Sequence, residues 1–361
     1  SSQVGGTELE ELENDPEARE ARRTMLETDP PEHTRIRKLV SRNFTRGAIS
    51  KWESTARALI AENIDKALLD HRVDFVETVA RQFPIQMISK LLGVPDRDAE
   101  ELFHWADSVV YHADPDFSDV LYDKDDTDPY RLLPFRSPNS LKVFKYAQQL
   151  AAEKERKPES DVVSMLAASD ELTPLEFQTF FLLLVIAGNE TTRHSLSHGA
   201  LALAKFPDQL DRLREEPDLM GAATEEILRW ASPQIHFRRT AVCDTELAGV
   251  PISAGDKVVM WYISANYDER AFADPFTLDL SRDPNPHVTF GGGGPHICLG
   301  AWMARLEVRV FLEEMVRRIR RIQLDGQPER IRSNFINVTK NEAAVLKLIE
   351  NDLPTKRRRR S

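Results

Sequence analysis

Residues Phe290–Gly300 read FGGGGPHICLG. Four consecutive glycines lead to Cys298, and a helical pattern of apolar residues begins at Ala301. Glycines let a backbone come very close to a flat or bulky group. A helix N-terminus favours a thiolate over a thiol, and a thiolate is a good soft ligand for iron. These residues alone leave two other interpretations open, a phosphate-binding glycine loop and a buried cysteine at a tight turn.

The composition indicates a soluble globular protein with one large core or two smaller ones, because 41% of the 361 residues are hydrophobic and 30% are charged. The net charge of −11 argues against a nucleic-acid binder. Cys243 and Cys298 are far apart, so we expect no disulfide framework and a cytoplasmic location. The apolar run Phe180–Ala187 is too short to cross a membrane, and no signal peptide is visible.

A long helix is predicted from Pro174 to Phe206. Thr173 can cap it, Pro174 suits its first position, and Glu176 completes a capping box. At 1.5 Å per residue such a helix spans about 50 Å. Other segments with a helical pattern are 30–37, Trp52–Leu69, Phe83–Leu92, Glu100–Tyr111 and Ala301–Ile319, and the Asp- and Pro-rich segment 113–139 is predicted to be a long loop or lid.

The middle of the long helix carries AGNETT, residues 187–192. Gly188 lowers helix propensity and lets a neighbour approach the backbone, so a kink beside a ligand is one interpretation. Glu190 would then relay protons and Thr191 would act beside it as a hydrogen-bonding alcohol. The other interpretation is a helix that emerges into solvent at Asn189.

Two pairs of charged residues are spaced to share a helix face, His33 with Arg37 and Glu226 with Arg229. Spacing alone favours solvated surface pairs, which contribute about 0–1 kcal/mol each. Further on, the segments 247–252 and 257–263 are predicted to form a hairpin joined through residues 253–256.

Four elements in order, HTRIR (33–37), AGNETT (187–192), EILR (226–229) and FGGGGPHICLG (290–300), make the chain resemble the cytochrome P-450 family. The extra glycine before Cys298 is similar to the bacterial subgroup that oxidises sterol side chains and long or branched alkyl chains. The resemblance implies a mainly α fold with a small β-rich part, in which the long helix and the cysteine loop sandwich a haem. It implies one domain over residues 1–361, with a polar lead-in at 1–28, a lid at 113–139 and a basic tail at 355–361. The N-terminal helix and first strands of the family are expected to be missing.

The resemblance also implies roles for particular residues. Cys298 would be the thiolate ligand of the iron of haem b, and Glu190 and Thr191 would be the catalytic pair. The residues expected to bind the cofactor are His33, Arg37, Ala187, Gly188, Arg239, Phe290, Gly291, His296, Cys298 and Gly300. Arg239, rather than its neighbour Arg238, matches the arginine that meets a haem propionate. The pair Glu226–Arg229 would be a buried structural element; its usual third partner is replaced by Thr277, and Arg282 is the candidate substitute.

The activity implied is that of a haem-thiolate monooxygenase acting on an apolar small molecule, a sterol, terpenoid or fatty acyl chain. It would use O2 and electrons from NAD(P)H, delivered by a ferredoxin reductase and a ferredoxin to a monomer. Arg305 and Arg309 are the candidate docking residues for such an acidic partner, unless they form an ordinary solvated face. The alternatives are a peroxide-driven enzyme, against which Glu190 and Thr191 argue, a haem-binding sensor or carrier without turnover, and a monooxygenase of small aromatic molecules.

Overall fold

The computed structural model describes residues 1, 6, 7, 9, 15–69, 73–121, 125–341, 349 and 350. The predicted basic tail at 355–361 therefore lies outside the described residues, as does most of 1–14. The α-helices are α1 Pro16–Ala21, α2 Glu32–Ser41, α3 Arg46–Ile49, α4 Glu53–Leu69, α5 Gln82–Leu92, α6 Asp96–Val110, α7 Asn139–Arg156, α8 Val162–Ala167, α9 Pro174–Lys205, α10 Pro207–Glu215, α11 Met220–Ala231, α12 Tyr262–Asn266 and α13 Ala301–Arg318.

Shorter elements complete the described chain. One π-helical turn, η4 Val76–Ala80, and six 3₁₀ turns connect the helices: η1 Met25–Glu27, η2 Arg42–Phe44, η3 Ser50–Trp52, η5 Asp128–Tyr130, η6 Pro134–Arg136 and η7 Pro217–Leu219. The strands are β1 His236–Thr240, β2 Thr245–Leu247, β3 Val250–Ile252, β4 Lys257–Trp261, β5 Ile319–Arg321, β6 Glu329–Arg330, β7 Thr339–Asn341 and β8 Ile349–Glu350. The fold is thus mainly helical, as the sequence predicted.

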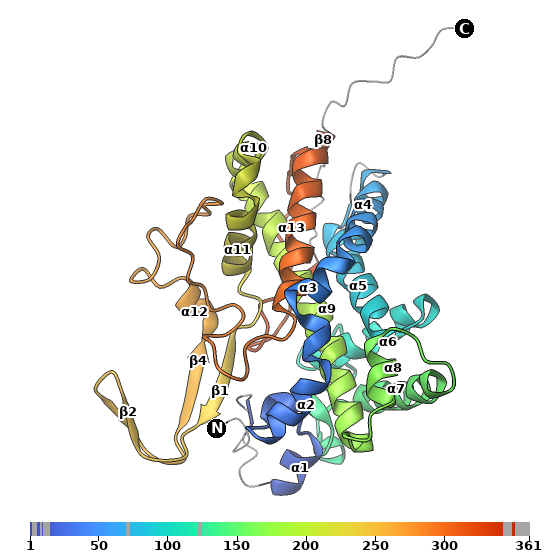
Figure 1. The fold of residues 1–361 in the computed structure, drawn as a ribbon. Coiled ribbons are helices and arrows are strands. Elements are labelled where there is room, and N and C mark those ends of the chain that lie inside the picture. Colours follow the sequence, from blue (N-terminus) through green and yellow to red (C-terminus); the bar gives the residue numbers. More distant parts are fainter. Residues whose placement is uncertain are drawn as a thin grey trace.

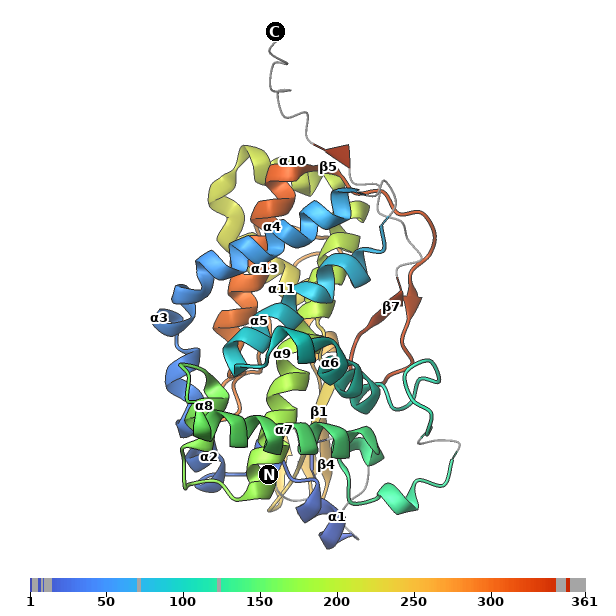
Figure 2. The same ribbon diagram turned by 90° about the vertical axis from the view of Figure 1, so that its right-hand side faces the viewer.

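The long helix α9 lies at the centre and packs against α5, α6, α7, α11 and α13 (Figures 1 and 2). It begins where the capping box predicted, because the backbone N–H of Glu176 donates to Thr173 Oγ1 (3.2 Å) and that of Thr173 donates to Glu176 Oε2 (2.7 Å). Buried side chains occur all round the helix, which is typical of a helix enclosed by others.

Helix α1 and the predicted lid are far apart in the sequence but are in contact in the structure. The lid residues that the structure describes form a loop with two short turns, η5 and η6. Arg131 of this loop forms ion pairs with Asp15 and with Glu17 of α1, and Arg22 Nε donates to the carbonyl oxygen of Arg131 (2.6 Å). The polar lead-in and the lid are therefore joined by charged side chains.

The β-rich side corrects one prediction. Strand β1 pairs antiparallel with β4, with His236 opposite Trp261, and β2 pairs with β3 in a separate hairpin (Figure 1). The predicted single strand 247–252 is instead broken by a turn at Ala248 and Gly249, both of which have positive φ (53° and 82°). Two central residues with positive φ are the geometry of a tight hairpin turn, so 247–252 folds back on itself and 257–261 pairs with β1.

Within the described ranges, none of the helices combines the length and the apolar character that crossing a membrane requires.

Candidate functional site

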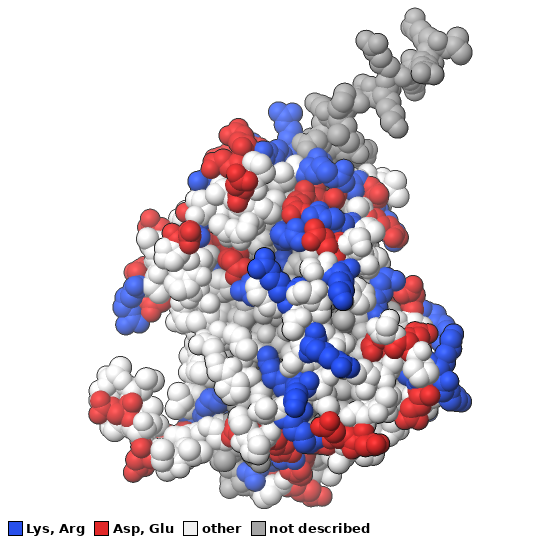
Figure 3. Space-filling model, viewed as in Figure 1, with Lys and Arg blue, Asp and Glu red and all other residues white. Residues whose placement is uncertain are grey.

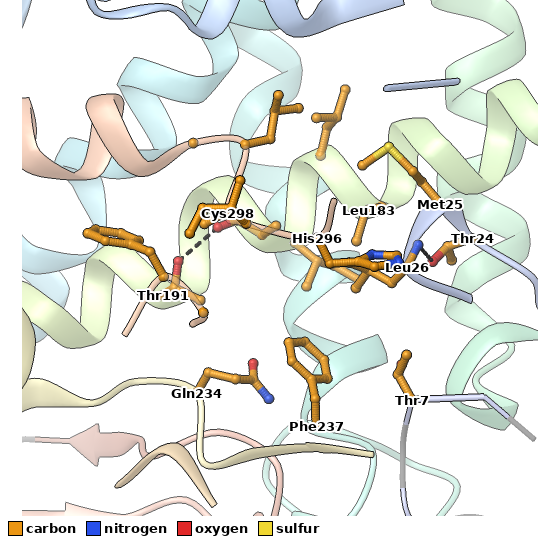
Figure 4. A pocket seen from close by; sticks show the side chains of 18 of the residues that line it. Thr7, Thr24, Met25, Leu26, Leu183, Thr191, Gln234, Phe237, His296 and Cys298 are labelled. Carbon is orange, nitrogen blue, oxygen red and sulfur yellow. Dashed lines mark hydrogen bonds between the residues drawn. The ribbon is translucent and has the colours of Figure 1, made fainter. Parts of the chain in front are cut away.

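A cavity of about 670 Å³ opens between α9 and the cysteine loop. Every residue that the sequence proposed for catalysis or cofactor binding lies on its wall, although these residues come from α2, α9, β1 and the loop 290–300. Figure 4 shows Cys298, Thr191, Gln234 and Phe237 around this cavity. The fold therefore assembles one site from four segments that are far apart in the sequence.

The cysteine loop is shaped by its backbone. The N–H of Cys298 donates to the carbonyl oxygen of Phe290 (2.9 Å), and Gly291, Gly293 and Gly294 adopt φ values of 91°, 105° and 77°. Only glycine adopts such values without strain. No atom within 4 Å would meet a Cβ on the loop glycines, so the cavity side of the loop is open.

The thiol of Cys298 is exposed to the cavity. Burial raises the pKa of Cys298, and the backbone N–H of Gly300 and the guanidinium groups of Arg37 and Arg305 only partly oppose that shift. The backbone N–H at the helix start thus acts in the expected direction, favouring the thiolate against the effect of burial. A cation placed against the sulfur would stabilise the thiolate form of Cys298.

Four basic side chains face the same part of the cavity: His33, Arg37, Arg239 and His296. The ring centroids of His33 and His296 are 4.1 Å apart. Burial lowers the pKa of His33, and burial together with the positive charge around it lowers the pKa of His296 to about 4. Arg239 lines the cavity, whereas Arg238 points to the opposite face of β1 and is fully buried. These groups would be stabilised by an anion.

A haem fits this arrangement. Both ring nitrogens of His33 are buried and, among the described residues, neither has a hydrogen-bond partner. A propionate carboxylate would satisfy them and would meet Arg37 and Arg239. The open glycine loop leaves room for the flat face of the macrocycle above Cys298.

The middle of α9 contradicts the interpretation of a helix that emerges into solvent at Asn189. The helix continues without interruption through Gly188. A Cβ on Gly188 would lie 2.6 Å from Ile88 Cδ1, so the glycine is required for the approach of α5. Asn189 is fully buried and does not emerge into solvent. Its amide donates to Glu190 Oε1 (2.7 Å) and is 3.5 Å from Asp107 Oδ1.

Glu190 belongs to a buried polar cluster. Its Oε2 is 3.3 Å from His194 Nε2, which is also 2.8 Å from the hydroxyl of Tyr111. Arg193 Nη1 is 3.4 Å from Asp107 Oδ2 and 3.9 Å from Glu190 Oε1. Burial and the nearby Glu190 raise the pKa of Asp107 well above its usual range, so this carboxyl tends to keep its proton.

The cluster reaches the surface through Arg81. The Nε atom of Arg81 is 3.7 Å from Asp107, and its Nη1 is 2.8 Å from Glu100, whose side chain is 69% exposed. A chain of acidic and basic groups therefore connects solvent with Glu190 on the cavity wall.

The pair Glu226 and Arg229 is completely buried, not a surface pair. Two N–H groups of Arg229 donate to the carboxylate (both 2.8 Å), and Arg282 Nε donates to Glu226 Oε2 (3.1 Å). Arg282 is thus the third partner in place of Thr277. Arg229 Nη1 also donates to the carbonyl oxygen of Asn266 (2.8 Å). The Asn266 side chain accepts from the N–H of Val288 (2.8 Å), which places the start of the cysteine loop.

The proposed docking residues are not free cations. Arg305 forms a bidentate pair with Glu225 and stacks over Phe290, with its guanidinium carbon 4.5 Å from the ring centroid. Arg309 pairs with Glu53 and Glu313. Both arginines therefore fix local structure around the loop.

Several cavity residues were not found from the sequence. Gln234 and Phe237 lie on the segment before Arg239, and Phe335 and Ile336 come from a segment near the C-terminal end. Strand alternation was the available signal for Phe237, since it lies two residues before Arg239. The segment 333–338 has no periodic pattern that would place it at the site.

Glu307 on α13 gives a test of the site's electrostatics. Its carboxyl lines the cavity, its Oε2 has no hydrogen-bond partner in the part of the chain described, and burial raises its pKa well above 4.5. Between the unfolded and folded pKa values the native state binds more protons, so stability falls as pH rises. We expect Glu307→Gln to be more stable than the parent protein, with a gain that is larger at pH 9 than at pH 5. Between the unfolded and the folded pKa of Glu307, the free energy of unfolding gained should rise by up to about 1.4 kcal/mol per pH unit.

Thermal unfolding at pH 5, 7 and 9 measures this gain. The control is Glu269→Gln, which changes an exposed carboxylate and should leave the difference flat across pH. A gain at Glu307 that does not change with pH would contradict a buried protonated acid.

Comparisons with known proteins place these features in context. Residues 10–347 match the family model described as cytochrome P-450. A methyl-branched lipid omega-hydroxylase of Mycobacterium tuberculosis is 39% identical over 335 residues, which cover 89% of this chain and 74% of the relative. A steroid C26-monooxygenase of Mycolicibacterium smegmatis is 39% identical over 325 residues, covering 89% and 72%. Among solved structures, a Mycobacterium marinum cytochrome P-450 in complex with pseudoionone matches with a TM-score of 0.85 at 39% identity, covering 95% of this chain and 81% of the other.

Proposed function

Because this chain belongs to the cytochrome P-450 family and is a monooxygenase, we propose that it hydroxylates a sterol or a methyl-branched alkyl chain with O2. The observation that carries the proposal is that Cys298 and Thr191 lie on the wall of one cavity, whose surface is otherwise largely apolar. The relatives named for methyl-branched lipids and for steroids support this substrate class. A terpenoid is the next candidate, since the structural neighbour binds pseudoionone.

The cofactor that we propose is haem b. Cys298 would hold the iron, His33, Arg37 and Arg239 would hold the propionates, and the loop at Phe290–Gly294 would lie against the macrocycle face. When bound, a haem with a thiolate ligand supplies the oxygen activation needed to attack an unactivated C–H bond. The protein supplies binding, orientation and protons.

Proton delivery is the role that we assign to the cluster around Glu190. Arg81 lies between the exposed Glu100 and Asp107, but its guanidinium stays charged and relays no proton itself. The raised pKa of Asp107 favours its protonated form, and Asn189 lies between it and Glu190. Glu190 then passes protons towards Thr191, the adjacent residue on the cavity wall.

Electrons are proposed to come from NAD(P)H through a ferredoxin reductase and a ferredoxin. The candidate docking surface lies next to the cysteine loop, where Ile297 and Trp302 are 37% and 41% exposed. Figure 3 shows Lys and Arg side chains along the middle of this face, over α2 and α3. Its exposed cations without an ion pair in the described ranges are Lys38, Arg42, Arg46 and Lys51. They replace Arg305 and Arg309 as the residues that would meet an acidic partner. We further propose that the enzyme is a cytoplasmic monomer.

The test is a spectral titration of the haem-loaded protein with sterols, methyl-branched fatty acids, terpenes and small aromatics, followed by NADPH consumption and product analysis with a ferredoxin and its reductase. We expect a saturable spin-state shift with a sterol or branched lipid, together with faster NADPH consumption and a hydroxylated product. Binding without turnover would instead indicate a sensor or carrier. A shift confined to aromatics would refute the substrate class.

Thr191→Ala should uncouple oxygen use from product formation. The Oγ1 atom of Thr191 donates to the carbonyl oxygen of Ala187 (2.9 Å), which leaves its lone pairs directed to the cavity. Without this hydroxyl, proton delivery at the cavity wall is no longer ordered by the side chain of residue 191. We therefore expect the amount of hydroxylated product per NADPH consumed to fall at least about tenfold. The ratio of product to NADPH measures the effect.

Thr179→Ala is the matched control for Thr191→Ala. Thr179 lies on the same helix, makes the same type of bond to the carbonyl oxygen of Leu175 (3.0 Å) and does not line the cavity. The ratio of product to NADPH in Thr179→Ala should stay at the value of the parent protein. An unchanged ratio in Thr191→Ala would remove Thr191 from the proton route.

A further inference from the structure

Gln234 carries a polar group whose orientation is fixed by its surroundings. Its Nε2 donates to the carbonyl oxygen of His236 (2.9 Å) and to that of Phe335 (3.0 Å). Carbonyl oxygens only accept hydrogen bonds, so the group facing them must be the NH2 and not the oxygen. Both amide hydrogens are used, and Oε1 is left pointing the other way.

The backbone that holds Gln234 is itself fixed. The N–H of Ile235 donates to the carbonyl oxygen of Phe335 (3.0 Å), and the N–H of Asn337 donates to that of Pro233 (2.8 Å). The Asn337 side chain donates to the carbonyl oxygen of Ala231 (2.9 Å). The segments 231–237 and 333–338 therefore form one platform, and the amide of Gln234 has little freedom to turn over.

The free oxygen faces the cavity. Figure 4 shows the Gln234 amide with its oxygen on the side of Thr191 and Cys298. No described residue donates a hydrogen bond to Gln234 Oε1. A bound molecule that enters the cavity meets this atom as an unsatisfied acceptor, and an acceptor that loses water without gaining a donor is unfavourable.

Two hydroxyls on α9 also present hydrogen-bond acceptors, like Gln234 Oε1. Thr191 Oγ1 donates to the carbonyl oxygen of Ala187 and Ser195 Oγ donates to that of Thr191, both at 2.9 Å. Each hydroxyl has one hydrogen, and the helix uses it. Thr191, Ser195 and Gln234 all line the cavity, and all three present lone pairs to it.

We propose that this acceptor set selects an apolar ligand that carries a hydroxyl donor, with Gln234 Oε1 as the residue atom that accepts the hydrogen bond. A ketone at the same place would bring its own lone pairs against Gln234, and a hydrocarbon would leave Oε1 unsatisfied. The inference rests on the proposed function and narrows its substrate class to alcohols.

The experiment uses the haem-loaded protein and sets of three matched ligands, one set built on a steroid nucleus and one on a methyl-branched chain. Each set contains an alcohol, the corresponding ketone and the deoxy compound, and spin-state titration gives the dissociation constants. For at least one set we expect the alcohol to bind about threefold to tenfold more tightly than both partners. Gln234→Met, which keeps the size and removes the amide, should abolish that preference.

The deoxy compound tests whether the platform keeps its structure in Gln234→Met. Its affinity should not fall in Gln234→Met, because it makes no hydrogen bond to the amide and the substitution removes the acceptor that it leaves unsatisfied. An alcohol preference that survives the substitution, or no alcohol preference in either set, overturns the inference about Gln234. Failure of the proposed function has a different signature, the absence of any spectral shift with all six ligands.

Discussion

Replacing Cys298 with alanine is expected to abolish thiolate ligation of the haem and, with it, monooxygenase activity. Among the residues that line the cavity, Cys298 is the one thiol, and its sulfur is exposed to the interior. The loop backbone of the variant should be unchanged, since the N–H of residue 298 still reaches the carbonyl oxygen of Phe290. The measurement is the absorption spectrum of the reduced carbon monoxide complex, in which a thiolate ligand has a characteristic band, together with product formation.

The chain contains its own control for this substitution. Cys243 is exposed and lies between β1 and β2, away from the cavity. Cys243→Ala should leave the spectrum and the activity at parent values. Persistence of the thiolate band in Cys298→Ala would refute the assignment of the ligand.

The second large effect is expected at Arg229. Its guanidinium is completely buried and donates to Glu226 and to the carbonyl oxygens of Asn266 and Pro275. In Arg229→Met, these acceptors lose their donors and Glu226 loses its bidentate partner. Breaking a buried pair from one side typically costs about 3–5 kcal/mol, and denaturant unfolding should show a loss of this size.

Arg229→Met should also lower haem retention, because Asn266 places the start of the cysteine loop. The control is Arg212→Met, which removes an exposed pair with Glu216 on another helix (3.1 Å, side chains 37% and 52% exposed). We expect a loss of about 0–1 kcal/mol there and normal haem content. Equal losses at the two arginines would contradict a structural role for the buried pair.

The helices α2, α4, α5, α6, α9 and α13 could be predicted because their signals are local. The apolar periodicity gave α4 and α5 to within one residue at each end, and the capping box at Thr173 marked the start of α9. The failure at 247–252 was also local. Ala248 has a positive φ without being glycine, so the sequence contained no strong turn signal and the two short strands read as one.

The cavity-wall residues that belong to motifs could be predicted from the sequence, and those outside motifs could not. Motifs brought His33, Glu190 and Cys298 to one cavity, and the comparisons with known proteins support the family on which that grouping depended. Gln234 and Phe335 could not be found, because their position depends on pairing between two irregular segments about 100 residues apart. Asn189 was ambiguous for a related reason, since the partners of its buried amide include Asp107 of α6, which the local sequence does not show.

The ion pairs that Arg131 forms with Asp15 and with Glu17 of α1 lie close to solvent. Asp15 and Glu17 are 37% and 66% exposed, so each pair is screened by water and contributes little to the free energy of folding. The contact between α1 and the loop that carries Arg131 could therefore be lost at little cost in folding free energy, while the buried helices around α9 stay packed.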